Sequence, residues 1–164
     1  DLGYQRIATI TGNHDSTVSM DRLEGYKKAL NAAGREFNPE MVAEGDFSEA
    51  SGYQAVKLLL PMKPDAIVAQ SDIMAVGAMR WMQEIGLSIP EDVAIIGFDD
   101  IPVARQLNVQ LTTIRQPITR FGIKAVELLI DLIENGTKPA RRIILDTELV
   151  VRDSCGAKKI RVEV

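Results

Sequence analysis

The sequence predicts an α/β fold built on a doubly wound parallel sheet. Short apolar segments alternate with amphipathic helical segments along the first 117 residues, and this order implies a parallel sheet with right-handed crossovers. Residues 93–96 are apolar without polar alternation, which is typical of a strand buried on both faces. Gly97 ends this strand, and Asp99 and Asp100 follow it, at the edge where open α/β sheets place their ligands.

The first half of the chain supplies two strand–helix units. Residues 6–11 form a strand, and the helical segment after it carries apolar residues at spacings of three or four, namely Leu23, Tyr26, Leu30 and Ala33. Gly34 suits the C-terminal end of this helix. A short strand over 41–43 follows. Ser48 is then suited to cap a second helix, which Pro61 ends.

A third unit begins with a strand over 66–69. Ser71 or Asp72 caps the helix after it, and Gly86 ends that helix. The helix has apolar residues at helical spacing, so its methionines indicate packing and not a cofactor site; the apolar residues are Met74, Ala75, Ala78, Met79 and Met82.

The pattern changes in the last third of the chain. A short helical turn starts at Pro102, and a β-rich segment covers 111–114. After Pro117 one long helix runs to residues 135 and 136, and two further β-rich segments cover 141–145 and 148–152. The apolar side of the long helix contains Ile123, Val126, Leu129, Ile130 and Ile133.

Composition limits the kinds of protein that this chain can be. Its 164 residues with 46% hydrophobic content fit a soluble globular chain of about one domain. The chain shows no membrane-length apolar run and no signal-peptide pattern. A net charge of -4 without a Lys/Arg cluster argues against a nucleic-acid surface on the chain itself. Cys155 is the single cysteine, so an internal disulfide is excluded, and a cytoplasmic location is consistent with this. One cysteine and one histidine are also too few for a typical zinc site.

Polar residues follow each of the predicted strands. If the strands are parallel, their loops meet at one edge, and Arg22, about one turn into its helix, is placed to reach that edge. Carboxylates accept hydrogen bonds from neighbouring hydroxyls and an aromatic ring covers the apolar face of a sugar, so the mixture suits a polyhydroxylated ligand. The loop residues are Asn13, His14, Asp15 and Ser16; Asp46 and Phe47; Ser71 and Asp72; and Asp99 and Asp100.

Three linked motifs occur in a fixed order: SDIMAVGAM (71–79), GLSIPEDVAIIGFDD (86–100) and LTTIRQP (111–117). They closely resemble the effector-binding core of the lactose-repressor (LacI/GalR) family of bacterial transcription regulators. The resemblance covers roughly residues 3–154, because three upstream motifs fit as well: RIATITG (6–12), DRLEGYKKAL (21–30) and GDFSEASGY (45–53).

The resemblance implies a two-lobed, periplasmic-binding-protein-like core with a small effector between the lobes. Residues 1–114 correspond to the C-terminal subdomain without its first helix, and 115–145 to a helix and strand of the N-terminal subdomain. Residues 146–154 correspond to the return strand, and 155–164 form a tail that departs from the family pattern. The sequence thus looks like a C-terminal fragment, which would reach DNA only through a helix-turn-helix domain outside it.

Carried over residue by residue, the family's effector contacts fall on Ser19, Arg22, Phe47, Ser71, Asp99 and Gln116. Ser16 is the alternative to Ser19, because the loop before Arg22 differs in length from familiar members. The family also pairs as homodimers, and the apolar helical residues 75–81 are either available for such a contact or wholly internal.

Each of these residues has a plainer alternative. Ser71 and Asp72 are both good N-cap residues, and Asp72 is the one favoured as structural. Phe47 fits a core position equally well, and Asp100 suits a cap for the helical turn after it. The surface carboxylates that would compete for the Arg22 guanidinium are Glu24 and Asp46.

Two functions from different classes fit this site, and a third does not. His14, Asp15 and Ser16 are triad residue types, but adjacent residues on one loop cannot form a directed catalytic chain, so no enzyme is predicted. No phosphate-binding glycine loop is present and no cofactor is expected. The prediction is the ligand-sensing region of a regulator that binds a sugar or related effector, and the alternative is a sugar-binding protein of a transport system. An upstream helix-turn-helix favours the regulator, and a signal peptide favours the transporter component.

Overall fold

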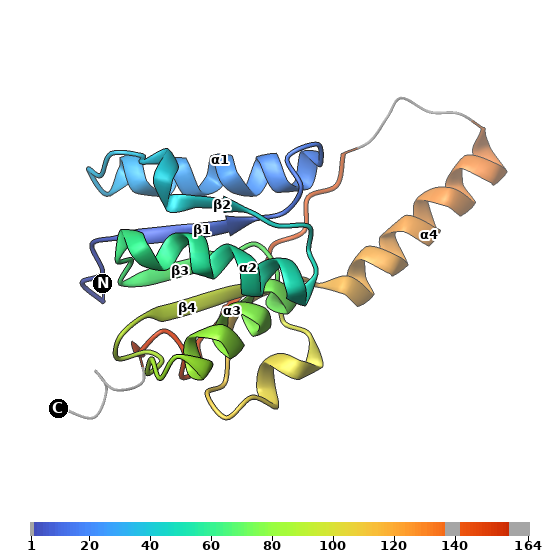
Figure 1. Cartoon of the computed structure of the whole chain (residues 1–164). Coiled ribbons are helices and arrows are strands. Elements are labelled where there is room, and N and C mark those ends of the chain that lie inside the picture. The colour runs from blue at the N-terminus through green and yellow to red at the C-terminus, as the bar shows by residue number, and fades with distance from the viewer. Residues whose placement is uncertain (1, 137–141, 158–164) are drawn as a thin grey trace, which may run out of the picture.

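The computed structural model describes residues 2–136 and 142–157, and its centre is a six-stranded sheet (Figure 1). Along the sheet the strands follow the order β2-β1-β3-β4-β5-β6. The first five are parallel and β6 is antiparallel to β5, so the predicted parallel sheet is confirmed with one antiparallel edge strand. The strands are β1 (Ile7–Thr11), β2 (Val42–Glu44), β3 (Ala66–Ala69), β4 (Ala94–Asp99), β5 (Thr112–Arg115) and β6 (Glu148–Val150).

Helices cover both faces of the sheet, but unequally. On one face α2 (Glu49–Leu59) and α3 (Asp72–Glu84) form the main core with the sheet (Figure 1). Of the helices in the described part of the chain, α1 (Thr17–Ala32) alone lies on the other face. Its buried residues Leu23, Tyr26 and Leu30 pack on Ile7 and Val42, as their spacing predicted.

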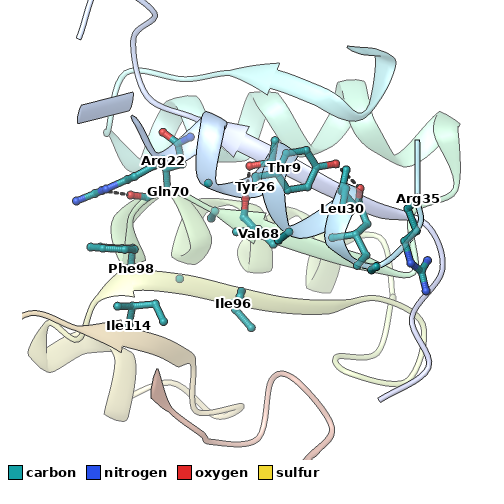
Figure 2. A pocket seen from close by; sticks show the side chains of 16 residues that line it. Thr9, Arg22, Tyr26, Leu30, Arg35, Val68, Gln70, Ile96, Phe98 and Ile114 are labelled. Atoms are coloured by element: carbon teal, nitrogen blue, oxygen red, sulfur yellow. Dashed lines mark hydrogen bonds between the residues drawn. The ribbon is translucent and has the colours of Figure 1, made fainter. Parts of the chain in front are cut away.

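Because α1 is alone on its face, an apolar groove of about 440 Å³ remains between it and the sheet (Figure 2). The strand residues that line it point away from the main core, as the alternation of side chains along a strand requires. The lining includes Tyr26, Leu30, Val68, Ile96, Phe98 and Ile114.

Two predicted helix ends are confirmed and one is decided between alternatives. Gly34 follows the C-cap of α1 with φ +68°, a conformation that glycine adopts without strain. The Ser48 side chain accepts a hydrogen bond from Ser51 N at the start of α2. At α3 the cap is Ser71, whose Oγ accepts from Met74 N, so Asp72 is not the cap.

The prediction that Gly97 ends its strand is wrong. Strand β4 continues through Gly97 to Asp99, because β5 pairs with it over residues 96–99. Glycine is required here for a different reason: a Cβ would overlap the Asp72 Oδ1 atom of the helix packed beside it. The chain therefore reaches the ligand edge two residues later than the glycine suggested.

Short 3-10 helices connect several of the elements. One of them confirms the predicted helical turn at Pro102. They are η1 (Pro39–Met41), η2 (Leu60–Met62) and η3 (Pro102–Arg105).

The last third of the chain differs from the rest. Helix α4 (Ile118–Asn135) leaves the sheet at the edge where the parallel strands end and runs away from it (Figure 1). None of its residues is buried, although one side is apolar. The predicted strand over 141–145 is wrong for 142–145, which pair with no strand in the described part of the chain; residue 141 lies outside that part. Of the predicted tail, residues 158–164 also lie outside it.

Residues 75–81 are in part internal, which was the alternative to a contact surface, whereas Val76 and Trp81 are half-buried and Arg80 is exposed. Ala75 and Ala78 are completely buried, and Met79 is 2% exposed. These three side chains belong to the main core between α2, α3 and the sheet. Within the described ranges, no helix is long and apolar enough to cross a membrane.

Candidate functional site

The candidate site lies at the edge of the sheet where β1, β2, β3 and β4 end. Three residues there have positive φ angles although they are not glycine: Phe47 at +68°, Asp99 at +119° and Asp100 at +54°. Such backbone conformations cost roughly 1–3 kcal/mol each and cluster at ligand sites, where the surrounding structure enforces them. Two of the three are predicted site residues.

Arg22 is held in place from three directions, and Figure 2 shows it beside two of its partners, Gln70 and Phe98. Its Nη1 donates a hydrogen bond to the carbonyl oxygen of Gln70, and its Nη2 lies 3.8 Å from Asp99 Oδ1. The guanidinium carbon lies 3.8 Å from the centre of the Phe98 ring, a cation–π arrangement. Burial lowers the pKa of Arg22, and the charge of Asp99 opposes this shift. The competing surface partner Glu24 pairs instead with Lys28, so Arg22 belongs to the site edge.

Asp99 receives its contacts on a single carboxylate oxygen. Gln116 Nε2 donates to Oδ1 at 2.6 Å, and Arg22 approaches the same atom. Its side chain is 27% exposed. Burial raises the pKa of Asp99, and the hydrogen bond from Gln116 and the charge of Arg22 only partly oppose this. Asp99 therefore retains acceptor capacity toward the solvent side of the edge.

Phe47 and Ser19 meet over Gly12. A Cβ on Gly12 would overlap both the Phe47 ring and the Ser19 hydroxyl, so the glycine allows their close approach. Phe47 is half-buried and packs on the main core, so it is in part the core residue of the plainer alternative. Ser19 is completely buried, and within the described residues its Oγ has no hydrogen-bond partner. A buried hydroxyl without a hydrogen-bond partner is uncommon in folded proteins, which makes Ser19 a candidate for a functional role.

Asp72 is structural, as predicted, but through different contacts. It is completely buried, and its carboxylate accepts from Thr113 Oγ1 at 2.5 Å and from Ile101 N at 2.9 Å. Burial raises its pKa, and these two hydrogen bonds oppose the shift. Asp72 thus ties the start of α3 to the loop that carries Asp99.

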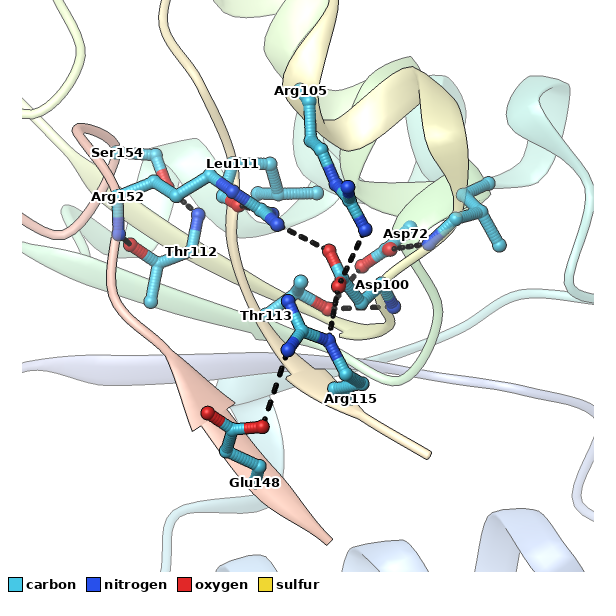
Figure 3. Close-up of polar contacts among 11 residues, drawn as sticks. Asp72, Asp100, Arg105, Leu111, Thr112, Thr113, Arg115, Glu148, Arg152 and Ser154 are labelled. Atoms are coloured by element: carbon cyan, nitrogen blue, oxygen red, sulfur yellow. Dashed lines mark hydrogen bonds and ion pairs between the residues drawn. The ribbon is translucent and has the colours of Figure 1, made fainter. Parts of the chain in front are cut away.

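Asp100 lies at the centre of an arginine cluster (Figure 3). Its carboxylate, 1% exposed, accepts from Arg115 at 2.6 Å, from Arg105 at 3.2 Å and from Arg152. Burial alone raises the pKa of Asp100, but hydrogen bonds from Arg152 and Arg115 and their charges outweigh it, so the pKa is lowered. The expected cap on the turn after it is wrong, because η3 has no side-chain cap and the arginines take both oxygens.

His14 does not form a catalytic chain with its neighbours. Its Nε2 lies 3.0 Å from Thr11 Oγ1, and its Nδ1 lies 3.3 Å from Glu44 Oε2. Asp15 and Ser16 take no part in these contacts. In the described part of the chain no three His, Cys, Asp or Glu side chains gather in a way that could hold a metal ion.

The structure therefore joins Arg22, Asp99 and Gln116 by direct contacts and places Ser19 beside Phe47. Ser71, 4% exposed, is bound to the helix that it caps. The residues that the sequence did not single out are Gln70, Phe98, Arg115 and Arg152. Gln70 alone carried a signal, since an amide directly after a buried strand is a polar residue at the ligand edge.

Comparison with known proteins identifies the family of the chain. The family model of a periplasmic binding protein-like domain matches residues 1–155. The transcriptional regulator CelR of Thermobifida fusca is 40% identical over 156 residues, which cover 94% of this chain and 46% of CelR. The repressor CytR of Escherichia coli is 37% identical over 159 residues, which cover 96% of this chain and 47% of CytR. The chain thus spans about half the length of these relatives.

A solved structure of a CelR–cellobiose complex superposes with a TM-score of 0.89 at 40% identity, over 93% of this chain and 47% of that one. A sugar-binding regulator of the LacI family from Escherichia coli, solved with phosphate, gives 0.85 at 37% identity, over 93% of this chain and 55% of that one. These proteins are regulators and not enzymes. From its motifs, its fold and these matches, the chain belongs to the periplasmic binding protein-like domain family, among the LacI-family regulators.

Proposed function

We propose that this chain is the ligand-sensing region of a cytoplasmic transcription regulator that controls a helix-turn-helix domain outside the chain. The observation that carries the proposal is the Arg22, Asp99 and Gln116 arrangement at the strand ends, on a chain whose relatives are regulators. A ligand that prefers one arrangement of the two lobes shifts the population of the DNA-binding state by its difference in affinity.

The chemistry of the edge favours a sugar or a related polyhydroxylated effector. Asp99 offers acceptors to ligand hydroxyls, and Phe47 offers an aromatic ring beside the buried, unpaired hydroxyl of Ser19. We assign the effector contacts to these residues together with Arg22, Ser71 and Gln116. The relative solved with cellobiose supports a sugar as the class of ligand.

Two unpartnered apolar surfaces support the assignment of the chain to parts of two lobes. The groove beside α1 is apolar and lies on a face where a doubly wound sheet carries helices, so we assign it to the first helix of this lobe. The apolar side of α4, from Ile118 to Ile133, is exposed and faces none of the described sheet. We assign 116–145 to the second lobe, because Arg115 is the last residue of β5, and 146–154 to the strand that returns.

Homodimerisation is part of the proposal, with a corrected surface. Ile73 on α3 is 39% exposed, and Val76 and Arg80 line a shallow hollow of about 310 Å³ together with Leu107. An apolar patch rimmed by polar groups is typical of an interface between copies. We expect the intact protein to sediment as a dimer at micromolar concentration. Val76→Glu should shift it to monomer, and a wild-type protein that is only monomeric contradicts this part.

The function itself is tested by a thermal-shift screen of the intact protein. The panel contains cellobiose, D-ribose, adenosine and adenine, because a ligand that binds only the folded state raises the melting temperature by mass action. We expect a sugar to give the largest shift and to change the affinity for operator DNA. A shift with adenine alone would replace the sugar by a purine, and no shift with any member contradicts the proposed ligand class.

A further inference from the structure

We propose that Gln70 is a positioning residue for the ligand site: its side-chain amide fixes the beginning of α1 against the sheet and thereby sets where Ser19 and Arg22 stand. This inference rests on the proposed function for its ligand, but the contacts that carry it do not. Gln70 follows the last residue of β3 and is 3% exposed.

Both ends of the Gln70 amide are used. Its Oε1 accepts a hydrogen bond from Gly12 N at 3.1 Å, and its Nε2 donates one to Ser19 O at 3.1 Å. The reversed amide would set an acceptor against the Ser19 carbonyl and a donor against the Gly12 N–H, so only one orientation satisfies both groups. Gln70 therefore recognises two different partners on the same loop.

These two partners are the ends of one segment. Gly12 directly follows β1, and Ser19 lies in the first turn of α1, so Gln70 closes residues 12–19 into a loop of fixed span. The main chain of Gln70 adds two further ties: its N donates to Ile10 O at 2.9 Å, and its O accepts from Arg22 Nη1 (Figure 2).

The closed loop decides the orientation of the site side chains. Ser19 and Arg22 are three residues apart, so they occupy the same side of α1, and Gln70 contacts both. A rotation of this helix end would carry the Ser19 hydroxyl away from Gly12 and the Arg22 guanidinium away from Asp99. We infer that the amide is needed for affinity and not only for stability.

Thr9 provides a matched control for the structural contribution alone. It is completely buried in the neighbouring strand β1, and its Oγ1 donates to Val68 O at 2.9 Å. Thr9→Val keeps the shape and removes one buried hydrogen bond, which costs about 1 kcal/mol of stability. None of its hydrogen bonds reaches a site residue, so this variant should destabilise without loss of affinity.

The test compares Gln70→Met, Gln70→Glu and Thr9→Val in the intact protein. Calorimetry uses the tightest binder among cellobiose, D-ribose, adenosine and adenine. We expect Gln70→Met and Gln70→Glu to weaken binding by about 10-fold or more, which is about 1.4 kcal/mol, and Thr9→Val to bind within about 2-fold of wild type. Gln70→Glu keeps an acceptor for Gly12 N but sets a carboxylate oxygen against Ser19 O, so it removes only the hydrogen bond to Ser19.

A second readout does not depend on the ligand. Backbone amides of residues 12–22 should exchange hydrogen faster in Gln70→Met than in Thr9→Val. Local opening of this segment depends on the hydrogen bonds that hold it, and Gln70→Met removes two of them. Unchanged affinity in both Gln70 variants, or exchange in 12–22 no faster than in Thr9→Val, overturns the inference. If wild type binds no member of the panel, the proposed ligand class fails, and the exchange comparison alone decides the role of Gln70.

Discussion

Two adjacent carboxylates mark the difference between the ligand edge and the scaffold behind it. Asp99 and Asp100 both have positive φ angles; Asp99 is the last residue of β4, and Asp100 directly follows that strand. Asp99 is 27% exposed and has one close hydrogen bond, from Gln116. Asp100 is 1% exposed and has three arginines. The left-handed turn between them sends one carboxylate to the ligand edge and the other into the protein.

This difference separates the pKa values of two identical side chains. Burial is the largest effect at both, and it raises the pKa of Asp99 because one amide and a distant guanidinium do not offset it. At Asp100 the hydrogen bonds from Arg152 and Arg115 do more than offset burial. When the protein's own hydrogen bonds and charges do not fully offset the burial of a carboxylate, hydrogen bonds from a ligand can stabilise its charge further. The fold thus stabilises the charge of Asp100 and leaves the Asp99 carboxylate available for hydrogen bonds to a ligand.

Asp100→Asn should produce the largest loss of stability. It removes the charge that three guanidinium groups share and leaves Arg152, 8% exposed, without its carboxylate. Removing one partner of a buried ion pair costs about 3–5 kcal/mol, and this loss should appear as a lower urea midpoint with an unchanged slope. A loss below about 1 kcal/mol would mean that the cluster contributes no more than a surface ion pair. It would contradict the assignment of Asp100, in contrast to Asp99, to stability.

Asp99→Asn should do the opposite, with a large effect on binding and a small one on folding. The substitution keeps the shape but turns one acceptor into a donor, so calorimetry should show effector affinity weakened by about 10- to 100-fold. Because burial disfavours the charge of Asp99, we expect the melting temperature to stay equal or to rise. Equal affinity together with a large fall in melting temperature would make Asp99 a structural residue.

The pH dependence of unfolding should resolve the two carboxylates by sign. The lowered pKa of Asp100 gives stability above the ordinary carboxyl pKa, which is lost as the pH falls through the folded value. The raised pKa of Asp99 gives stability at low pH, which is lost as the pH rises through the folded value. Urea titrations from pH 3 to pH 7 should show less acid destabilisation in Asp100→Asn than in wild type. In Asp99→Asn they should show more stability gained with rising pH than in wild type. Identical pH profiles of the two variants would contradict both assignments.

Glu49→Gln should give the smallest effect and sets the reference for the cluster. Glu49 pairs with Arg80 at 2.5 Å, but both side chains are exposed, at 42% and 53%. Exposed ion pairs contribute about 0–1 kcal/mol and weaken with salt, so the urea midpoint should barely move. A loss comparable to that of Asp100→Asn would show that burial is not what distinguishes the two ion pairs.

Much of the fold could be predicted because the sheet is buried on both faces. Residues 66–69 and 93–96 are apolar without alternation, and the first of these segments precedes helix α3, which has a clear apolar side. The predicted strand over 142–145 failed because a β-rich segment forms a strand only beside another strand, and none of the described strands lies next to it. The end of β4 was misplaced because Gly97 is required by the Asp72 carboxylate across the helix–sheet contact, which no local pattern reveals.

The sequence by itself determined the parallel α/β order, the family, and the residues at the strand ends, because these depend on local periodicity and on motifs of fixed spacing. Tertiary structure decided which of the polar side chains at the strand ends are structural and which one is open to a ligand. Asp72 and Asp100 are as polar in sequence as Asp99, but the first bridges to Thr113 and the second is enclosed by arginines from distant segments. Those partners are 5 to 52 residues away along the chain, so only the folded chain brings them to one carboxylate and leaves Asp99 open.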